Sequence, residues 1–406
     1  MKKIITIAWR NIWRNRTRSM VVIAAIMIGL IGGIFLISFG FGMQEGRTRS
    51  IIETQISHIQ IHTSTFLEDR YTKDTLPEKA DLIKTLDTLS NMRGYSLRTL
   101  VGGMANSAKA AGGVSIQGID PAAEAIVTQL PDRIIEGAYF EGVRRNPVVI
   151  GQKLAEKLKV SLKKKIILTF QDKDGEITSG AFRIAGIYKS VNSKYDETNV
   201  FVRARDLQKI LGQQGQIHEV AILLENDQNT LSLQKNLQTA FPDYLVDSWR
   251  ETSPDLKLVA DSLGASLGIF MSIIMLGLAF GIINTMLMAV LERTRELGML
   301  MSIGMNKRSI FSMIMLETFF LAMVGVPIGL FIAFGLVTYF GKNGIDMSSF
   351  SDGLNELGFS NIAYTSLDPS YYTQIAIMVA ITALLSAIYP ALRALRLKPA
   401  EAVRSL

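Results

Sequence analysis

Four long blocks of apolar residues constrain the fold of this 406-residue chain more than any other feature of its sequence. The block 20–42 carries no charge, and at about 1.5 Å per residue it would be roughly 35 Å long, enough to cross a hydrocarbon core of about 30 Å. It is too long for the apolar run of a signal peptide, so we expect it to remain as an anchor. Because a chain in lipid must satisfy its own backbone, the blocks predict four transmembrane helices, at 20–42, 262–291, 309–341 and 370–392.

Basic residues beside these blocks predict how the chain crosses the membrane, because Lys and Arg near a span remain on the cytoplasmic side. The segments 1–19, 292–308 and 393–406 are rich in Lys and Arg, whereas the short loop 342–369 is acidic. We therefore expect both termini and the 292–308 loop in the cytoplasm, and the segment 43–261 outside. The basic flanks also explain the net charge of +7, which then indicates contact with anionic lipid rather than with nucleic acid.

The outer segment 43–261 is long enough to form a core of its own, and its apolar pattern switches between a period of 2 and a period near 3.6. It therefore predicts an α+β domain inserted between the first and second spans. The candidate strands are 57–62, 113–119, 147–150, 165–170, 181–188, 199–203, 218–224 and 244–249. The candidate helices are 77–89, 151–158, 204–211 and 230–241.

Patterns typical of catalytic or metal sites are sparse. The lack of Cys excludes disulfides, zinc-thiolate sites and Cys nucleophiles. His58 and His62 would lie roughly 13 Å apart on an extended strand, too far to bind one metal ion, and we expect both to be exposed. No G-x-S-x-G pattern occurs, and 335–343 departs from the phosphate-binding loop pattern. We therefore expect no catalytic residue and no metal site, and we expect any ATP to be bound by another chain.

A short charged segment separates the second apolar block from the third. The sequence LERTRELGMLMSIGMN, residues 291–306, places Glu292, Arg293, Arg295 and Glu296 ahead of an amphipathic helix. A loop of this kind is unusual between membrane spans unless a partner binds to it. We interpret it as a docking surface for a soluble partner.

Small residues four positions apart in the spans predict that helix backbones approach closely. Such pairs fit a dimer interface, and they also occur in the packing of any membrane helix. They are Gly29 and Gly33, Gly264 and Gly268, Gly277 and Gly281, and Gly325 and Gly329.

Three polar features lie in or beside the spans. Glu317 is an acid inside a span, and because it lies near the cytoplasmic end we expect it to reach headgroup water or to pair with a base, with proton coupling as the alternative. The segment 250–260 is expected to run as an unbroken helix into the second span, as a rigid stalk or as an interfacial helix. Trp9 and Trp13 predict an amphipathic helix that anchors the N-terminus at the membrane or contacts the soluble partner.

Several motifs resemble the four-span ABC permeases of the MacB and FtsX superfamily, over most of the chain. Two motifs are shared across that superfamily, at 292–304 in the charged loop and at 389–402 near the C-terminus. Segments of the outer domain are similar to the lipoprotein-releasing permeases of the LolC and LolE type, at 42–45, 57–59, 118–121, 149–158, 184–187 and 195–196.

The resemblance implies a dimer of permease protomers, identical or homologous, that two ABC ATPase subunits holding ATP and Mg drive from the cytoplasm. Substrate would not pass through the membrane; the complex would lift a lipoprotein from the bacterial inner membrane onto a periplasmic carrier. The alternatives are a MacB-like efflux permease for peptides or amphiphiles, and an FtsX-like scaffold that controls a cell-wall hydrolase. The residues that the resemblance assigns to ATPase coupling are Glu292, Arg293, Arg295, Glu296, Leu297, Gly298, Met301, Ile303, Gly304 and Met305.

Overall fold

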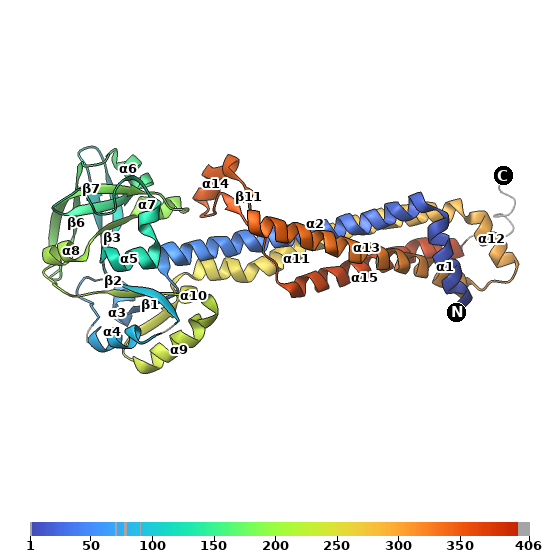
Figure 1. The fold of residues 1–406 in the computed structure, drawn as a ribbon, viewed down its shortest axis with the longest axis horizontal. Coiled ribbons are helices and arrows are strands. Elements are labelled where there is room, and N and C mark those ends of the chain that lie inside the picture. The colour runs from blue at the N-terminus through green and yellow to red at the C-terminus, as the bar shows by residue number, and fades with distance from the viewer. Residues whose placement is uncertain (1, 70, 77–78, 90, 397–406) are drawn as a thin grey trace. The chain divides into compact units, whose positions relative to one another are not determined.

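The computed structural model describes residues 2–69, 71–76, 79–89 and 91–396, and the chain forms two compact units (Figure 1). The helical unit comprises residues 1–45, 261–346 and 362–406, and the sheet unit comprises residues 46–260 and 347–361. The residues 397–402 of the C-terminal motif lie outside the described part of the chain.

Four helices are long and apolar enough to cross a membrane, which confirms the four predicted spans. They are α2 (Arg16–Ile51), α11 (Pro254–Glu292), α13 (Lys307–Asn343) and α15 (Pro369–Leu395). Each is longer than the block that predicted it, because helix bounds follow backbone hydrogen bonds and not composition alone. The unit also contains the short helices α1 (Lys2–Arg14) and α12 (Thr294–Ser302).

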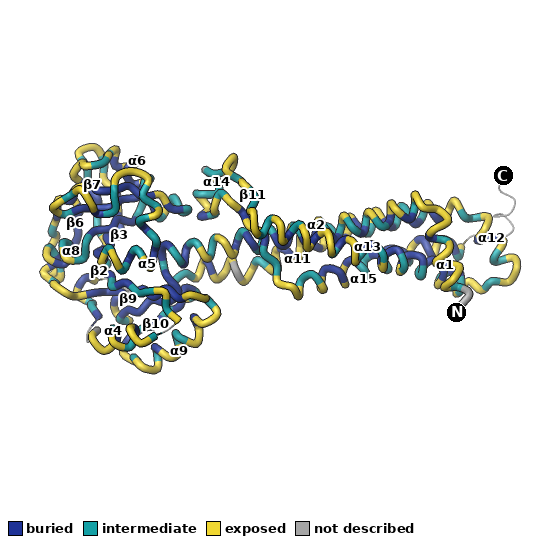
Figure 2. The backbone as a smooth tube through the Cα atoms, viewed as in Figure 1, coloured by how far each residue is buried: buried dark blue, intermediate teal, exposed yellow. Residues whose placement is uncertain are grey.

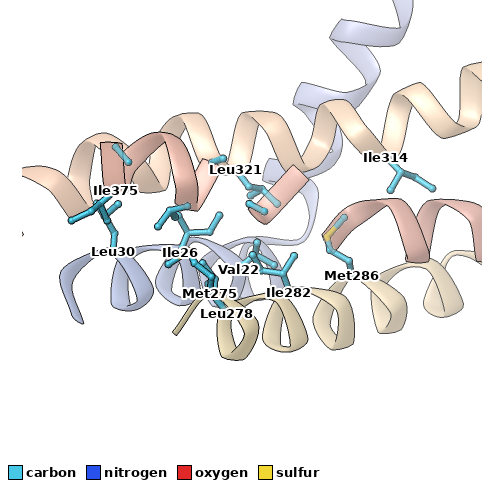
Figure 3. Packing of buried hydrophobic residues seen from close by; sticks show 14 of the residues in the cluster. Val22, Ile26, Leu30, Met275, Leu278, Ile282, Met286, Ile314, Leu321 and Ile375 are labelled. Atoms are coloured by element: carbon cyan, nitrogen blue, oxygen red, sulfur yellow. The ribbon is translucent and has the colours of Figure 1, made fainter. Parts of the chain in front are cut away.

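The core of the helical unit is built from aliphatic side chains of all four long helices. Val22, Ile26 and Leu30 of α2 pack among residues of α11, α13 and α15, and Figure 3 shows side chains of the four helices pointing toward one another. The opposite helix faces carry exposed apolar residues such as Phe280 and Phe331. Figure 2 shows this alternation along the tube, a pattern that suits helices in contact with lipid.

The predicted glycine pairs fall into two classes. A Cβ added at Gly33 would lie 3.0 Å from Met271 of α11, and one at Gly329 would lie 2.9 Å from Leu30 of α2. Gly29 and Gly325 make similar close approaches to Leu278 and Ile26, so these four glycines pack helices of one chain together. The other four meet no atom within 4 Å at the added Cβ, and they are Gly264, Gly268, Gly277 and Gly281.

The sheet unit is built on ten strands in the order β10-β1-β9-β2-β3-β8-β5-β7-β4, with β6 paired to β2 and β7 (Figure 1). The long strand β2 (Met92–Asn106) joins two halves: residues 92–98 pair with β9, and residues 99–106 pair with β3. The strands β1 and β10 are antiparallel, with Ile59 opposite Ser248 and His62 opposite Leu245. The bounds of β1 and β10 are Ile59–His62 and Leu245–Ser248. The remaining strands are β3 (Ala111–Ile119), β4 (Ile134–Gly137), β5 (Pro147–Gly151), β6 (Lys165–Gln171), β7 (Ile177–Tyr188), β8 (Asn199–Arg203) and β9 (Glu219–Leu224).

Eight of these strands and four of the helices match predicted segments, which confirms an α+β architecture; β2 and β4 were not predicted. The predicted helices correspond to α4 (Lys79–Asp87), α6 (Gln152–Leu158), α8 (Ala204–Leu211) and α9 (Thr230–Ala240). The additional helices are α3 (Ser64–Asp69), α5 (Pro121–Thr128), α7 (Ser193–Thr198) and α10 (Trp249–Thr252).

Two expectations need correction. His58 and His62 are buried, not exposed, because His58 accepts a hydrogen bond from the Leu224 amide and His62 pairs with Glu219. The helix expected over 250–260 is interrupted, because α10 ends at Thr252 and α11 begins at Pro254. A residue that precedes a proline disfavours helical φ and ψ angles, and Ser253 holds that position. Within the 342–369 loop, residues 347–361, with α14 (Ser351–Glu356), belong to the sheet unit.

Candidate docking site on helix α12

The charged loop between α11 and α13 folds into a helix of its own because three residues set its limits. Arg293 leaves the helical conformation, with φ −102° and ψ 15°, and so ends α11 and precedes α12. Gly304 takes a φ of +99°, a left-handed conformation that glycine adopts without steric cost, and this turns the chain after α12. Asn306 then caps α13 by accepting a hydrogen bond from the Arg308 amide.

Helix α12 separates the ten predicted coupling residues into inward and outward sets. Leu297, 4% exposed, and Gly298 face the helical core, and Met301 and Met305 pack partly against it. Ile303 is 85% exposed, the largest exposed fraction among the large hydrophobic residues that the structure describes. The other outward residues are Glu292, Arg295, Glu296 and Gly304.

Arg293 belongs to the inward set and makes the best-defined polar contact of the loop. Its Nη1 donates to Glu317 Oε1 of α13 at 3.2 Å, and its Nη2 donates to the Asn11 carbonyl oxygen of α1 at 3.3 Å. The Asn11 side-chain Nδ2 donates to the same Glu317 oxygen at 2.7 Å. Glu317 therefore pairs with a base, one of the two outcomes expected of an acid in this span.

The N-terminal helix α1 is held to α12 as well. Arg14 at the end of α1 forms an ion pair with Glu296, and both side chains are about half exposed. On the inner face of α1, Ala8 and Ile12 are buried in the helical core, whereas Trp9 and Trp13 are exposed. Figure 1 shows α1 and α12 at the same end of the helical unit.

Sequence reasoning found the loop but missed two of its partners. Asn11 and Arg14 contact residues 282 or more positions away, so no local pattern connects them to the loop. The signal that could have found the Arg293 contact was Glu317, because an acid in an apolar span needs a nearby base.

The site combines an exposed apolar side chain with flanking charges, and it is tied to three other helices. An exposed apolar side chain with charged groups at its margin is a combination found at protein interfaces. Among the residues that the structure describes, no group of three or more His, Asp or Glu could hold a metal ion.

Comparison with known families gives two matches that together span nearly the whole chain. Residues 19–240 match the MacB-like periplasmic core domain, and residues 268–399 match the FtsX-like permease C-terminal domain. The second match contains α12 and its partner Glu317.

Individual relatives are similar at low identity. An uncharacterized ABC transporter permease of Methanocaldococcus jannaschii is 24% identical, covering 80% of this chain and 82% of the relative. The lipoprotein-releasing system transmembrane protein LolC of Neisseria meningitidis is 20% identical over 95% of this chain and 94% of the relative. The macrolide export ATP-binding/permease protein MacB of Campylobacter jejuni is 22% identical over 82% of this chain, which spans only 53% of that relative's length. Because the MacB-like match alone covers more than half of the residues, the chain belongs to the MacB/FtsX superfamily of ABC transporter permeases.

Proposed function

We propose that a separate ABC ATPase, holding ATP and Mg, docks on the outward face of α12 and drives this permease. The exposure of Ile303 carries the proposal, because burying a large aliphatic side chain against a partner is favourable, and the charged residues 292–296 at the other end of α12 can form the polar rim. Leu297 and Gly298 would position the helix from its inner side. Arg295 and Glu292 would supply the polar rim.

Movement of α12 would reach the other helices through its covalent and polar links. Arg293 connects α12 to α13 through Glu317, and Arg14 connects α1 to α12 through Glu296. Helix α11 has 39 residues, about 58 Å at the usual rise, which exceeds a hydrocarbon core of about 30 Å. Its first residues belong to the sheet unit, so a displacement at α12 would be transmitted along one continuous helix.

A second protomer, identical or homologous, would complete the complex. The glycines Gly264, Gly268, Gly277 and Gly281 of α11 lie open on this chain, which leaves room for a helix of another protomer to approach. We expect a bacterial inner-membrane protein with both termini in the cytoplasm and the sheet unit in the periplasm, since the basic residues flank α1, α12 and the end of α15.

For the substrate, we propose a lipoprotein that the complex extracts from the membrane and transfers to a periplasmic carrier. The nearly end-to-end similarity to LolC supports this substrate class. The MacB-like match over 19–240 favours a second candidate, the export of peptides or amphiphiles. The FtsX-like match favours a third, a scaffold that passes an ATPase signal to a cell-wall hydrolase.

Depletion of the protein in its native cell, followed by fractionation of acylated proteins between inner and outer membranes, separates these candidates. Lipoprotein release predicts that mature lipoproteins accumulate in the inner membrane. Unchanged sorting would reject it: retention of an amphiphilic compound would then favour export, and loss of cell-wall hydrolase activity would favour the scaffold. The docking proposal is tested separately, by measuring whether the ATPase co-purifies with an Ile303 variant. Loss of the ATPase would support the proposal, and unchanged co-purification would contradict it.

A further inference from the structure

Residues 347–361 of the sheet unit form a loop that is closed at its base. The short strand β11 (Ile345–Asp346) pairs with β12 (Ile362–Ala363), which brings the two ends of the loop together. The Met347 amide then donates a hydrogen bond to the Asn361 carbonyl oxygen at 2.7 Å. The loop therefore leaves and rejoins the chain at one point.

The sequence of α13 places the base of this loop at a membrane surface. Residues 318–341 carry no charge, and at about 1.5 Å per residue they extend about 36 Å, slightly more than a hydrocarbon core of about 30 Å. Lys342 follows directly and marks the end of the apolar stretch. Because β11 begins three residues after Lys342, its first residue lies within about 11 Å of that end, even if the chain is fully extended.

One face of the loop is apolar and exposed. Phe350 and Leu357 are 68% and 62% exposed, and Leu354 between them is half-buried. Spacings of four and three residues are those of a single helix face, and the helical turns here are η4 (Ser348–Phe350) and α14. We call Phe350, Leu354 and Leu357 the apolar loop face.

Other residues of the loop fix it to the sheet unit. The guanidinium carbon of Arg47 lies 5.1 Å from the centre of the Phe359 ring, a cation–π contact. Gly358 is buried beside it with a φ of +76°, and a Cβ added there would lie 3.5 Å from Arg47 Nε. The loop is thus held through Gly358 and Phe359, which leaves the exposed side chains of the apolar loop face free to contact something else.

Lipid suits this face better than water does. Apolar and aromatic side chains at the level of the headgroups gain free energy by inserting about 5–10 Å into the bilayer boundary. Tyr339 of α13, 60% exposed and three residues before Lys342, continues the lipid-facing side of that helix to the same level. The charges close to the loop in sequence are mostly acidic, so headgroups without net charge fit it better than anionic ones.

We propose that the apolar loop face inserts among the headgroups of the leaflet in which α13 ends. The sheet unit would then be attached to the membrane at a third place, in addition to its covalent connections to α2 and α11. The lipid in contact with the loop is zwitterionic. This proposal depends on the transmembrane position of α13, but not on the ATPase docking or on the substrate.

The test uses single cysteines, which is straightforward because the chain contains no Cys of its own. The full-length variant Leu357→Cys carries the fluorophore NBD and is placed in phosphatidylcholine nanodiscs, in which a small fraction of the lipid bears a nitroxide on its headgroup. The reference is the same label on Ile177→Cys, since Ile177 is 79% exposed on β7. We expect the nitroxide lipid to quench the label at position 357 at least about threefold more strongly than the label at position 177.

A second variant separates insertion of the loop from insertion of the fluorophore by itself. Phe350→Asp, added to the labelled Leu357→Cys protein, places a charge in the apolar loop face and should reduce the quenching at least about twofold. Ser349→Asp adds the same charge at the neighbouring exposed position, which is not part of that face, and is the matched control. It should leave the quenching nearly unchanged.

Three results would overturn the proposal. Equal quenching at positions 357 and 177 would mean that the loop stays in water. A blue-shifted emission at position 357 without quenching by the lipid would mean that protein, not lipid, covers the face. Equal effects of Phe350→Asp and Ser349→Asp would mean that the fluorophore and not the apolar loop face enters the bilayer.

Discussion

Arg293 and Glu317 face each other across 3.2 Å, and this contact joins the residue that ends α11 to the first third of α13. Their side chains are 12% and 8% exposed, so the pair is largely withdrawn from solvent. Residues of the charged loop 292–308 that look equivalent in sequence therefore have different environments: Arg293 holds the loop to α13 and α1, whereas Arg295 faces outward.

Glu317→Gln should destabilise the protein by up to about 3–5 kcal/mol, because it leaves the Arg293 charge nearly buried without a carboxylate. Thermal unfolding in detergent measures the loss. The double variant Arg293→Met/Glu317→Met should recover most of the stability, since it removes both charges. If the losses of the single variants Arg293→Met and Glu317→Met simply add in the double variant, the residues are not coupled.

Ile303→Asp should weaken ATPase binding by about thirtyfold or more without changing the unfolding temperature, because a charge replaces the apolar centre of the docking surface. Co-purification of the ATPase and ATP hydrolysis by the complex measure the effect. Ile177→Asp is the matched control, since Ile177 is 79% exposed on β7. Equal ATPase binding by both variants would show that Ile303 is not part of the interface.

Gly42→Ala should lower the unfolding temperature, because the added Cβ would lie 1.8 Å from the Tyr364 carbonyl oxygen and 2.7 Å from the Ser366 amide. Both are backbone atoms that cannot rotate away, and the hydrogen bond from the Ser366 amide to the Ser38 carbonyl at 3.0 Å would be strained. The free energy of unfolding should fall by about 1–3 kcal/mol. Gly46→Ala, on the same helix with no atom within 4 Å, should be neutral or stabilising.

Asp196 should make the sheet unit less stable as the pH rises through about 6. Burial raises the pKa of this carboxyl to about 6 in spite of hydrogen bonds from Ser190. A raised pKa means that the folded state favours the protonated form, so the contribution of Asp196 is full below about pH 4 and is lost as the pH passes about 6.

The Asp196→Asn variant isolates this effect. Relative to the variant, the wild-type protein should lose up to about 2 kcal/mol between pH 4.5 and 7, as measured by hydrogen exchange of the sheet unit in the full-length protein. Glu219 does not interfere in this window: burial raises its pKa, but Arg98 and His62 outweigh that effect and lower it to about 2. A constant difference between the two proteins would show that Asp196 titrates normally.

Composition and alternation were enough to predict the spans and most strands, but not the strand that organises the sheet unit. β2 contains three glycines and places Arg98 at its middle, features that argue against a buried strand. Its burial depends on Glu124 and Glu219, which are 26 and 121 residues away. His62 was misjudged for the same reason, since its partner Glu219 lies 157 residues away.

The charged loop 292–308 could be recognised in the sequence because its charges are contiguous, yet its two faces could not be distinguished. Which of Arg293 and Arg295 turns inward depends on where α12 packs, and α12 packs through Leu297 against helices from distant parts of the chain.

The pairing of β1 with β10 sets how the sheet unit would respond to a mechanical load. Helix α2 leads through η1 (Ile52–Ile56) into β1, and β10 leads through α10 into α11, so the two helices connect to neighbouring strands at the end where Ile59 faces Ser248. If α2 and α11 move apart, the ladder opens there and unzips one residue pair at a time. A displacement of β1 and β10 along the strand direction would instead load all four pairs together in shear.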